Sequence, residues 1–216
     1  MKGIIAVYKP KGPTSHDIID QIRKVTGERK VGHAGTLDPL ASGVLVVAIG
    51  REATRRLSLE VKKEKEYLAE IKFGLNSITD DEEGEKTIWP QPLNIPDKKL
   101  VKETLLLFVG EITQMPPAYS ALKIKGTSAY KLARKGLEVK LAERQVTIKQ
   151  IEFLDYTWPL LKIKVVCGPG VYIRALARDI GNKLGVGGYL TALERTRVGD
   201  FKIEEAIKVE QLGKDK

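Results

Sequence analysis

An uninterrupted run of six apolar residues, at positions 44–49, constrains the fold of this chain more than any other stretch. Its length and its closure by Gly50 are typical of a β-strand that is buried on both faces. The polar segment before it, residues 32–43, must therefore be attached to the core. Asp38 is the one acidic residue of this segment, and Pro39 biases it away from helical geometry. A carboxylate held in this way is a candidate for chemistry; the alternative is an Asx turn or a helix cap.

The charge of the chain favours a polyanionic partner. Among 216 residues, 37 Lys and Arg face 28 Asp and Glu, which gives a net charge of +9. The one cysteine, Cys167, excludes an intrachain disulfide and fits a reducing compartment, and two histidines and one cysteine cannot form a zinc cluster. No apolar run approaches the ~18 residues of a membrane span, and the apolar start is too short for a signal peptide. These features predict a soluble, cytoplasmic protein without a metal.

Periodicity predicts a mixture of helices and strands. Strict alternation over residues 66–73 predicts a strand that directs Tyr67 toward the interior, and a core tyrosine with a satisfied hydroxyl is the alternative reading. The acidic run at residues 80–85 is expected to be an exposed loop without chemistry. Further strands are expected over residues 4–8 and 161–167, and helices over residues 15–26, 51–59, 100–109 and 173–184.

Two groups of basic residues suggest recognition of an anion. Residues 114–150 hold eight basic and two acidic residues together with Tyr119 and Tyr130, a pattern that favours contact with nucleic acid over a merely solvated helix. Arg174 lies at a strand-to-helix turn, where a guanidinium can pair with a carboxylate or a phosphate; a surface arginine is the alternative. The candidate RNA-binding side chains are Lys123, Lys125, Lys131, Arg134 and Arg144.

Four ordered motifs resemble the TruB-type tRNA pseudouridine synthases. They are GHAGTLDPLASG at residues 32–43, YKPKGPTS at residues 8–15, MPPAYSALK at residues 115–123 and GPGVYIRALARD at residues 168–179. The resemblance spans roughly residues 3–212. It implies an α+β (mixed α/β) pseudouridine synthase fold, with a long mixed, mostly antiparallel sheet flanked by helices. It also implies a single catalytic domain over residues 1–216 with an RNA-clamping insertion at about residues 114–149, and no separate C-terminal PUA-like domain.

The resemblance implies isomerisation of uridine to pseudouridine at position 55 in the T loop of tRNA, by base flipping and without a cofactor. It gives Asp38 the role of the catalytic aspartate, Arg174 that of its arginine partner, and Tyr67 that of the residue that stacks on the flipped base. His33, Tyr172 and Leu193 are expected to contact the nucleotide or hold its pocket open. A monomer that acts on the T arm without a guide RNA is expected.

Two other functions fit the same motifs. A tRNA-binding or RNA-folding protein would use the basic segment without chemistry, although binding alone does not require the combination of Asp38, Tyr67 and Arg174. The same enzyme could also act on a different RNA, because shape complementarity over a whole RNA surface determines the target.

Overall fold

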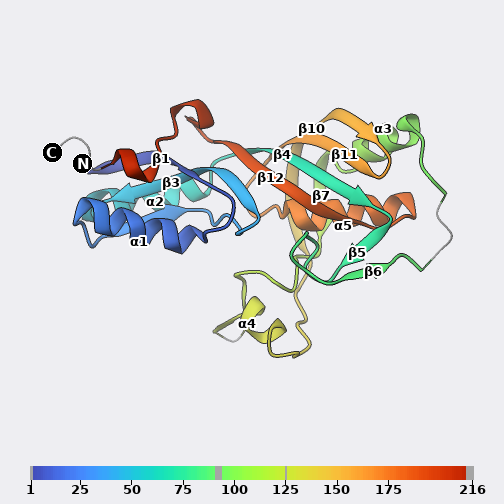
Figure 1. The fold of residues 1–216 in the computed structure, drawn as a ribbon, viewed down its shortest axis with the longest axis horizontal. Helices are drawn as coiled ribbons and strands as arrows, with labels where there is room; N and C mark the ends of the chain where they lie inside the picture. Colours follow the sequence, from blue (N-terminus) through green and yellow to red (C-terminus); the bar gives the residue numbers. More distant parts are fainter. Residues whose placement is uncertain (1, 91–93, 125, 213–216) are drawn as a thin grey trace. The chain divides into compact units, whose positions relative to one another are not determined.

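The computed structural model describes residues 2–90, 94–124 and 126–212, and Figure 1 shows the order of the elements. The chain divides into two compact units. Unit 1 contains Met1–Leu68, Val166–Pro169 and Ala192–Lys216, and unit 2 contains Ala69–Val165 and Gly170–Thr191. No helix in the described part of the chain is both long and apolar enough to cross a membrane.

Unit 1 is built on β3, which has neighbours along both edges. Strand β1 pairs with β3 in antiparallel orientation, β2 does the same on a shorter stretch, and β12 pairs with β3 in parallel. The elements of unit 1, including strands that extend beyond it, are β1 (Gly3–Lys9), α1 (Ser15–Thr26), β2 (Val31–Ala34), β3 (Ala41–Ile49), α2 (Arg51–Val61), β4 (Lys65–Phe73), β12 (Gly188–Val198), β13 (Phe201–Lys202), η1 (Ile203–Glu205) and η2 (Val209–Gln211).

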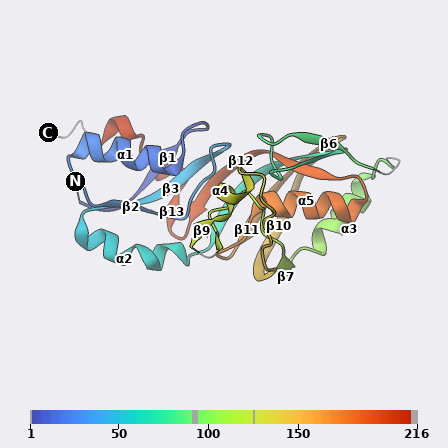
Figure 2. The same cartoon turned by 90° about the horizontal axis from the view of Figure 1, so that it is seen from below.

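Strand β3 is buried on both of its faces, as the apolar run predicts. Leu45 and Val47 pack with Ile18 of α1 in one apolar cluster. Val44 and Val46 belong to a second cluster, against which Leu57 of α2 packs. Figure 2 accordingly shows α1 and α2 on opposite sides of β1, β2 and β3. The segment that enters β3 is therefore attached to the centre of unit 1.

Helix α1 has clear sequence signals at both ends. Thr14 caps its first turn, and Asp17 completes a capping box with the Thr14 backbone. Gly27 ends the helix in the left-handed conformation, with φ 70°. The predicted apolar face is buried except for Val25, which is 37% exposed because it lies in the last turn.

Unit 2 contains a sheet in which β4, β11, β10 and β7 are successive neighbours. Helix α5 buries Ala175, Leu176 and Ile180, and it contacts α3. The predicted helix over residues 100–109 is shorter than expected, because α3 ends at Leu106 and the chain turns before Gly110. The elements of unit 2 are β5 (Leu75–Ser77), β6 (Lys86–Ile88), α3 (Lys98–Leu106), β7 (Gly110–Gln114), β8 (Lys123–Ile124), β9 (Thr127–Ser128), α4 (Ala129–Ala133), β10 (Arg144–Thr157), β11 (Leu160–Cys167) and α5 (Ile173–Leu184).

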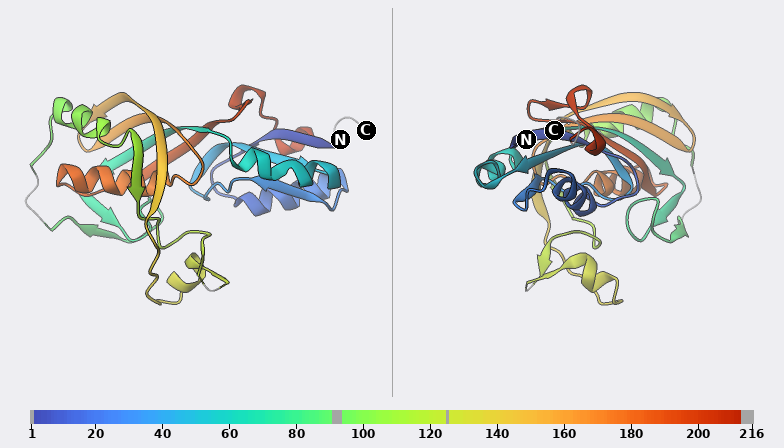
Figure 3. Two further views of the ribbon diagram at one scale, coloured as in Figure 1. Left: turned by 180° about the vertical axis from the view of Figure 1, so that it is seen from behind. Right: turned by 60° about the vertical axis from the view of Figure 1, so that its left-hand side comes forward.

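The basic insertion lies between β7 and β10. Figure 3 shows the chain leaving β7, forming a small projection around α4 and returning into β10. Arg144 pairs with Gln114 in the antiparallel ladder, so the projecting part ends before residue 144 rather than at about residue 149. Residues 144–149 are part of a strand because Val146 and Ile148 alternate into the core.

The predicted mixture of helices with a mixed, largely antiparallel sheet is confirmed. The strand pairs β1–β3, β2–β3, β7–β10 and β12–β13 are antiparallel, and β3–β12 is parallel. The alternating strand β4 buries Tyr67, Ala69, Ile71 and Phe73 as its sequence predicts.

Candidate active site

The segment that carries Asp38 is attached to helix α1 through Ser15. The Ser15 hydroxyl donates to the Leu37 carbonyl at 2.9 Å and accepts from the Leu37 amide at 2.8 Å. Both side chains are buried, so one hydroxyl satisfies both backbone groups of the residue before Asp38. Asp38 itself is half-buried. The backbone next to Asp38 is thus fixed at Leu37, and the Asp38 side chain keeps access to solvent.

The segment is also attached to the chain that follows β1. Lys9 is fully buried, and its ammonium donates to the Ala41 carbonyl at 2.6 Å and to the Pro10 carbonyl at 2.9 Å. The Gly12 amide donates to the Pro39 carbonyl at 2.8 Å. Contacts on both sides of Asp38 therefore come from the YKPKGPTS motif at residues 8–15.

A second group of buried cations lies beside the same segment. Arg195 is 1% exposed, and its guanidinium donates from Nε to the Val44 carbonyl at 2.8 Å and from Nη2 to the Gly35 carbonyl at 3.0 Å. Lys65 is also buried and donates to the carbonyls of Val61 and Lys63. Burial lowers the pKa of Lys65, and the charge of Arg195 lowers it further.

Tyr67 lies at the start of β4 with its ring buried. Burial raises the pKa of the Tyr67 hydroxyl, the charge of the Arg195 guanidinium opposes that increase, and the Asp38 carboxylate adds to it. The hydroxyl therefore stays protonated at neutral pH. Unit 1 brings Asp38 and Arg195 within electrostatic range of Tyr67.

His33 and Leu193 belong to the same unit. His33 lies on β2, where burial lowers the pKa of its imidazole and the charge of Arg195 lowers it further. Among the described residues, no hydrogen-bond partner is found for its Nδ1 atom. Leu193 pairs with Ala41 in the parallel ladder between β12 and β3, close in sequence to Asp38. A neutral imidazole and an apolar side chain are therefore both available near Asp38.

Unit 2 holds the other two predicted active-site residues at the start of α5. The Tyr172 amide donates to the Gln114 side chain at 2.9 Å, and the Gln114 amide group donates to the Tyr172 carbonyl at 3.2 Å. Arg174 is buried, which excludes the alternative of a surface arginine. Its Nη1 atom lies 3.5 Å from the Asp81 carboxylate, and its Nη2 atom donates to the Tyr119 carbonyl at 3.0 Å.

The acidic run at residues 80–85 is a loop with exposed glutamates, as its composition predicts, but its two aspartates pair with arginines of α5. Asp81 is 3% exposed and pairs with Arg174. Asp80 pairs with Arg178 at 2.8 Å, and the same arginine donates to the Met115 carbonyl. Burial raises the pKa of Asp80 to about 6 although Arg178 opposes the increase. Asp81 is thus buried and Asp80 half-buried, and each is paired with an arginine of α5.

The predicted RNA-binding side chains that the structure describes are exposed. Lys123 lies on β8, Lys131 and Arg134 lie in or next to α4, and Arg144 begins β10. Lys125 lies outside the described residues. A surface pocket of about 440 Å³ is lined by Lys131 and Arg134 together with Tyr130, over whose ring the Arg134 guanidinium lies 5.7 Å from the centroid. A cationic surface with an aromatic ring is suited to a phosphate backbone and its bases.

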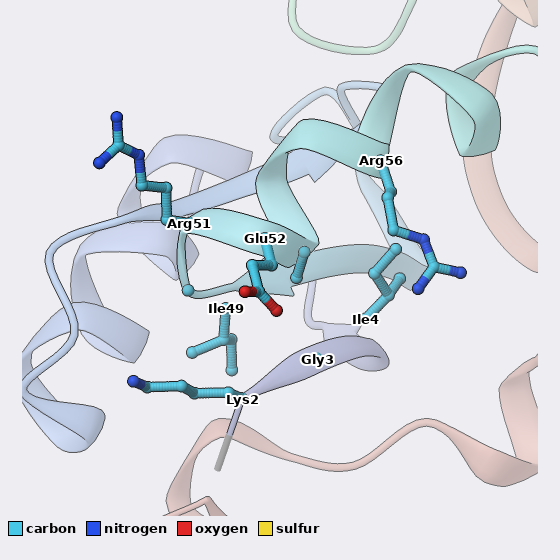
Figure 4. A pocket seen from close by; sticks show the side chains of 9 residues that line it. Lys2, Gly3, Ile4, Ile49, Arg51, Glu52 and Arg56 are labelled. Carbon is cyan, nitrogen blue, oxygen red and sulfur yellow. The ribbon is translucent and has the colours of Figure 1, made fainter.

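A second pocket, of about 470 Å³, lies at the opposite end of the β1–β3 pair from the Asp38 segment. Gly3, which pairs with Ile49, lines it together with Lys2, Arg51 and Glu52. In Figure 4 the Arg51 side chain extends away from Glu52. We assign no chemistry to this pocket. In the described part of the chain, no group of three or more His, Cys, Asp or Glu side chains is arranged to hold a metal ion.

The sequence alone does not identify Ser15 and Arg195 as support for Asp38, or Asp81 as the partner of Arg174. Thr14 caps α1, so the Ser15 hydroxyl is available to bond Leu37. No local signal reveals the burial of Arg195, because its partners are backbone carbonyls 151 and 160 residues away along the chain.

Two family models match the chain. Residues 23–173 match the TruB family pseudouridylate synthase N-terminal domain, and residues 174–215 match the tRNA pseudouridylate synthase B C-terminal domain. A protein of Clostridium tetani named tRNA pseudouridine synthase B is 44% identical over 215 residues, which cover 100% of this chain and 74% of that protein. A protein of the same name from Mycobacterium sp. (strain KMS) is 47% identical over 214 residues, which cover 97% of this chain and 71% of that protein.

Solved structures share the fold. A chain of a Cbf5–Nop10–Gar1 complex matches with a TM-score of 0.74 and 33% identity, over 96% of this chain and 52% of that chain. A chain of an H/ACA ribonucleoprotein bound to a substrate RNA matches with a TM-score of 0.71 and 31% identity, over 96% and 51%. This chain thus spans about half the length of those two solved chains. The extent of the family match and the identity to curated relatives show that this chain belongs to the TruB family of pseudouridylate synthases.

Proposed function

We propose that this chain isomerises a uridine of tRNA to pseudouridine, and that its target is position 55 in the T loop. Membership of the TruB family supports the reaction, and the name of the relatives, tRNA pseudouridine synthase B, supports tRNA as the substrate. The observation that carries the proposal is the half-buried Asp38, whose charge acts on Tyr67. Ser15 and Arg195 fix the backbone just before it, through hydrogen bonds to the carbonyls of Leu37 and Gly35.

The reaction is an isomerisation in which no electrons are gained or lost. The bond between ribose C1′ and uracil N1 breaks, the base turns, and C1′ is joined to C5. The proton on C5 leaves and N1 gains a proton, so product and substrate have the same composition. An ionised Asp38 has three possible roles, namely attack at C1′, removal of a ribose proton or stabilisation of positive charge at C1′. A rigid backbone beside a half-buried carboxylate serves each of them.

The base must leave the stack of the folded T loop before Asp38 can reach the ribose. The buried ring of Tyr67, fixed at the start of β4, offers a stacking surface for the flipped base, and its protonated hydroxyl is a possible proton carrier at C5. His33 and Leu193, on strands beside the Asp38 segment, would line the pocket. The roles that the resemblance gives to Arg174 and Tyr172 stay predictions.

The basic insertion would hold the T arm. Its exposed cations have no role in the core, and each phosphate that they neutralise would release counterions. Arg134 lying over Tyr130 adds a surface on which a base can stack. We expect the chain to act as a monomer without a guide RNA, in the cytoplasm, where its tRNA substrate is available.

Mapping of pseudouridine in an unmodified tRNA transcript tests the proposal. The purified chain is incubated with the transcript, and pseudouridine is located by chemical labelling followed by reverse transcription. We expect one signal, in the T loop. The Asp38→Asn variant should give none and should bind tRNA within about threefold of the unchanged chain, since the amide keeps the shape of the carboxylate but cannot ionise. Asp20→Asn, on the surface of α1, is the control.

If the unchanged chain binds tRNA tightly but forms no pseudouridine, the result would favour a tRNA-binding protein over an enzyme. A signal elsewhere in the tRNA would keep the reaction and overturn the target. Equal loss of binding and product in Asp38→Asn would remove the catalytic role from Asp38.

A further inference from the structure

One edge of β3 is shared end to end by two strands. Strand β1 occupies the other edge from Gly43 to Ile49. On the shared edge, β2 pairs with the far part of β3, and its last register pair joins Ala34 to Val46. Strand β12 pairs with the near part, and its last register pair joins Arg195 to Gly43. Between these two ladders, no strand in the described part of the chain pairs with β3 on this edge.

The side chain of Arg195 fills this junction. Its Nε atom donates to the carbonyl of Val44, which lies in the gap, and its Nη2 atom donates to the carbonyl of Gly35, the first residue after β2. Gly35 lies three residues before Asp38 and Val44 lies six residues after it. One planar guanidinium therefore joins the backbone on both sides of Asp38.

Burial of this arginine costs free energy, because the guanidinium loses its hydration. Arg195 is 1% exposed, and its guanidinium donates to the carbonyls of Val44 and Gly35. A buried cation whose hydrogen bonds go to uncharged carbonyls contributes little net stability, because its loss of hydration offsets those hydrogen bonds. Lysine cannot replace it without loss, since a single ammonium cannot reproduce the fixed separation of Nε and Nη2.

The same guanidinium also acts on Tyr67. Its charge opposes the rise in the pKa of the Tyr67 hydroxyl, so Arg195 lies within electrostatic range of the start of β4. A neighbouring arginine on the same strand does not share these contacts. Arg197 pairs with Glu64 and donates to the Gly199 carbonyl, and it is half-buried.

We propose that Arg195 is a positioning residue for the isomerisation. It holds the backbone on the two sides of Asp38, at Gly35 and Val44, at a fixed separation. Arg195 acts through this backbone, not on the substrate itself. The proposal rests on the proposed function of Asp38, and it concerns how that side chain is aimed.

The test compares Arg195→Lys with Arg197→Lys, the same substitution two residues along β12. Three quantities are measured for each variant: the dissociation constant for a tRNA transcript, the single-turnover rate of pseudouridine formation, and hydrogen–deuterium exchange of the peptide that contains residues 35–44. We expect Arg195→Lys to bind tRNA within about threefold of the unchanged chain and to lose on the order of 100-fold in rate, as misplacement of a reacting group by about 1 Å does. Exchange of residues 35–44 should rise in this variant alone.

A conservative second variant covers the case in which Arg195→Lys does not fold. Arg195→Gln keeps a planar donor that can reach one of the two carbonyls, and it should show the same division between rate and binding. A rate within threefold of the unchanged chain in a folded variant, or equal losses in the variants at 195 and 197, would overturn the proposal. If the unchanged chain makes no pseudouridine, the proposed function fails, and the exchange of residues 35–44 then decides on Arg195 by itself.

Discussion

Replacement of Gly43 by alanine tests how closely β3 and β12 approach each other beside the Asp38 segment. Gly43 has a φ of +105°, and a Cβ atom built on it would lie 2.2 Å from the Arg195 carbonyl oxygen and 2.7 Å from the Arg195 nitrogen. These are backbone atoms, which cannot rotate away as the end of a side chain can. Ordinary contact begins at 3.4 Å, so the two strands must separate by roughly 1 Å where they pair.

Gly110 provides the matched control. Its φ is +108°, and nothing lies within 4 Å of the corresponding Cβ position. Both alanine variants therefore share the conformational cost of a positive φ, about 1–2 kcal/mol. Gly43→Ala adds overpacking against backbone, about 1–3 kcal/mol. We expect a loss of about 2–5 kcal/mol in the free energy of unfolding for Gly43→Ala and about 1–2 kcal/mol for Gly110→Ala.

Urea unfolding of the two variants, followed by circular dichroism, measures both losses. If Gly43→Ala folds, its rate of pseudouridine formation should also fall more than that of Gly110→Ala, because the displaced strand carries Arg195. Equal losses of stability in the two variants would refute the close approach of β3 and β12 as the reason for glycine at position 43.

Ser15→Ala leaves the buried amide and carbonyl of Leu37 without their partner, so it should lower the free energy of unfolding by about 1–3 kcal/mol and slow the reaction, whereas exposed Ser58→Ala should do neither. An unchanged rate in Ser15→Ala would mean that Asp38 does not depend on this contact. Burial raises the pKa of Asp80 to about 6, so the folded chain keeps a proton that the unfolded chain loses near pH 3.8. The contribution of Asp80 to stability is complete below pH 3.8 and is lost as the pH rises through 6. Over that range, the free energy of unfolding should fall, relative to that of Asp80→Asn, by at most about 3 kcal/mol. If the difference in unfolding free energy between the two proteins stays constant with pH, the burial of Asp80 is not the cause. Loss of three cations from the insertion should weaken tRNA binding and reduce the salt slope by about 2–3, since each cation contacts a phosphate. The variant replaces Lys123, Lys131 and Arg134 by alanine. Its control removes three charges from α2, at Arg51, Arg55 and Arg56. Equal slopes for variant and control would show that the insertion is not the specific contact.

Local patterns predicted the elements whose residues are determined by their immediate neighbours. The run at residues 44–49 required a strand with both faces covered, and α1 and α2 cover them. The alternation around Tyr67 similarly predicted which side of β4 is buried. In each case the pattern within one segment is sufficient: strict alternation indicates a strand with one buried face, and a continuous apolar run indicates a strand with two.

The contacts that aim the candidate catalytic groups do not leave such a signal. Arg195 is bonded to carbonyls, and every residue has a carbonyl, so no side-chain pattern marks its partners. Asp81 lies in a run of acids that composition alone assigns to a loop, and its burial depends on Arg174, which is far away in the sequence. Pairing across such separations becomes visible only when the strand order is known.

The distance between Arg195 and Val44 along the chain also has a consequence for protein synthesis. The hydrogen bond joins residues 151 positions apart. A ribosome that adds about 5–20 residues per second completes Arg195 roughly 8 to 30 s after Val44. Throughout that time, the nascent chain displays the aspartate motif without the strand that shapes it. An unfinished chain would therefore meet the cell's RNA with this part of its catalytic segment still unformed, and activity would arise only when translation of β12 is complete.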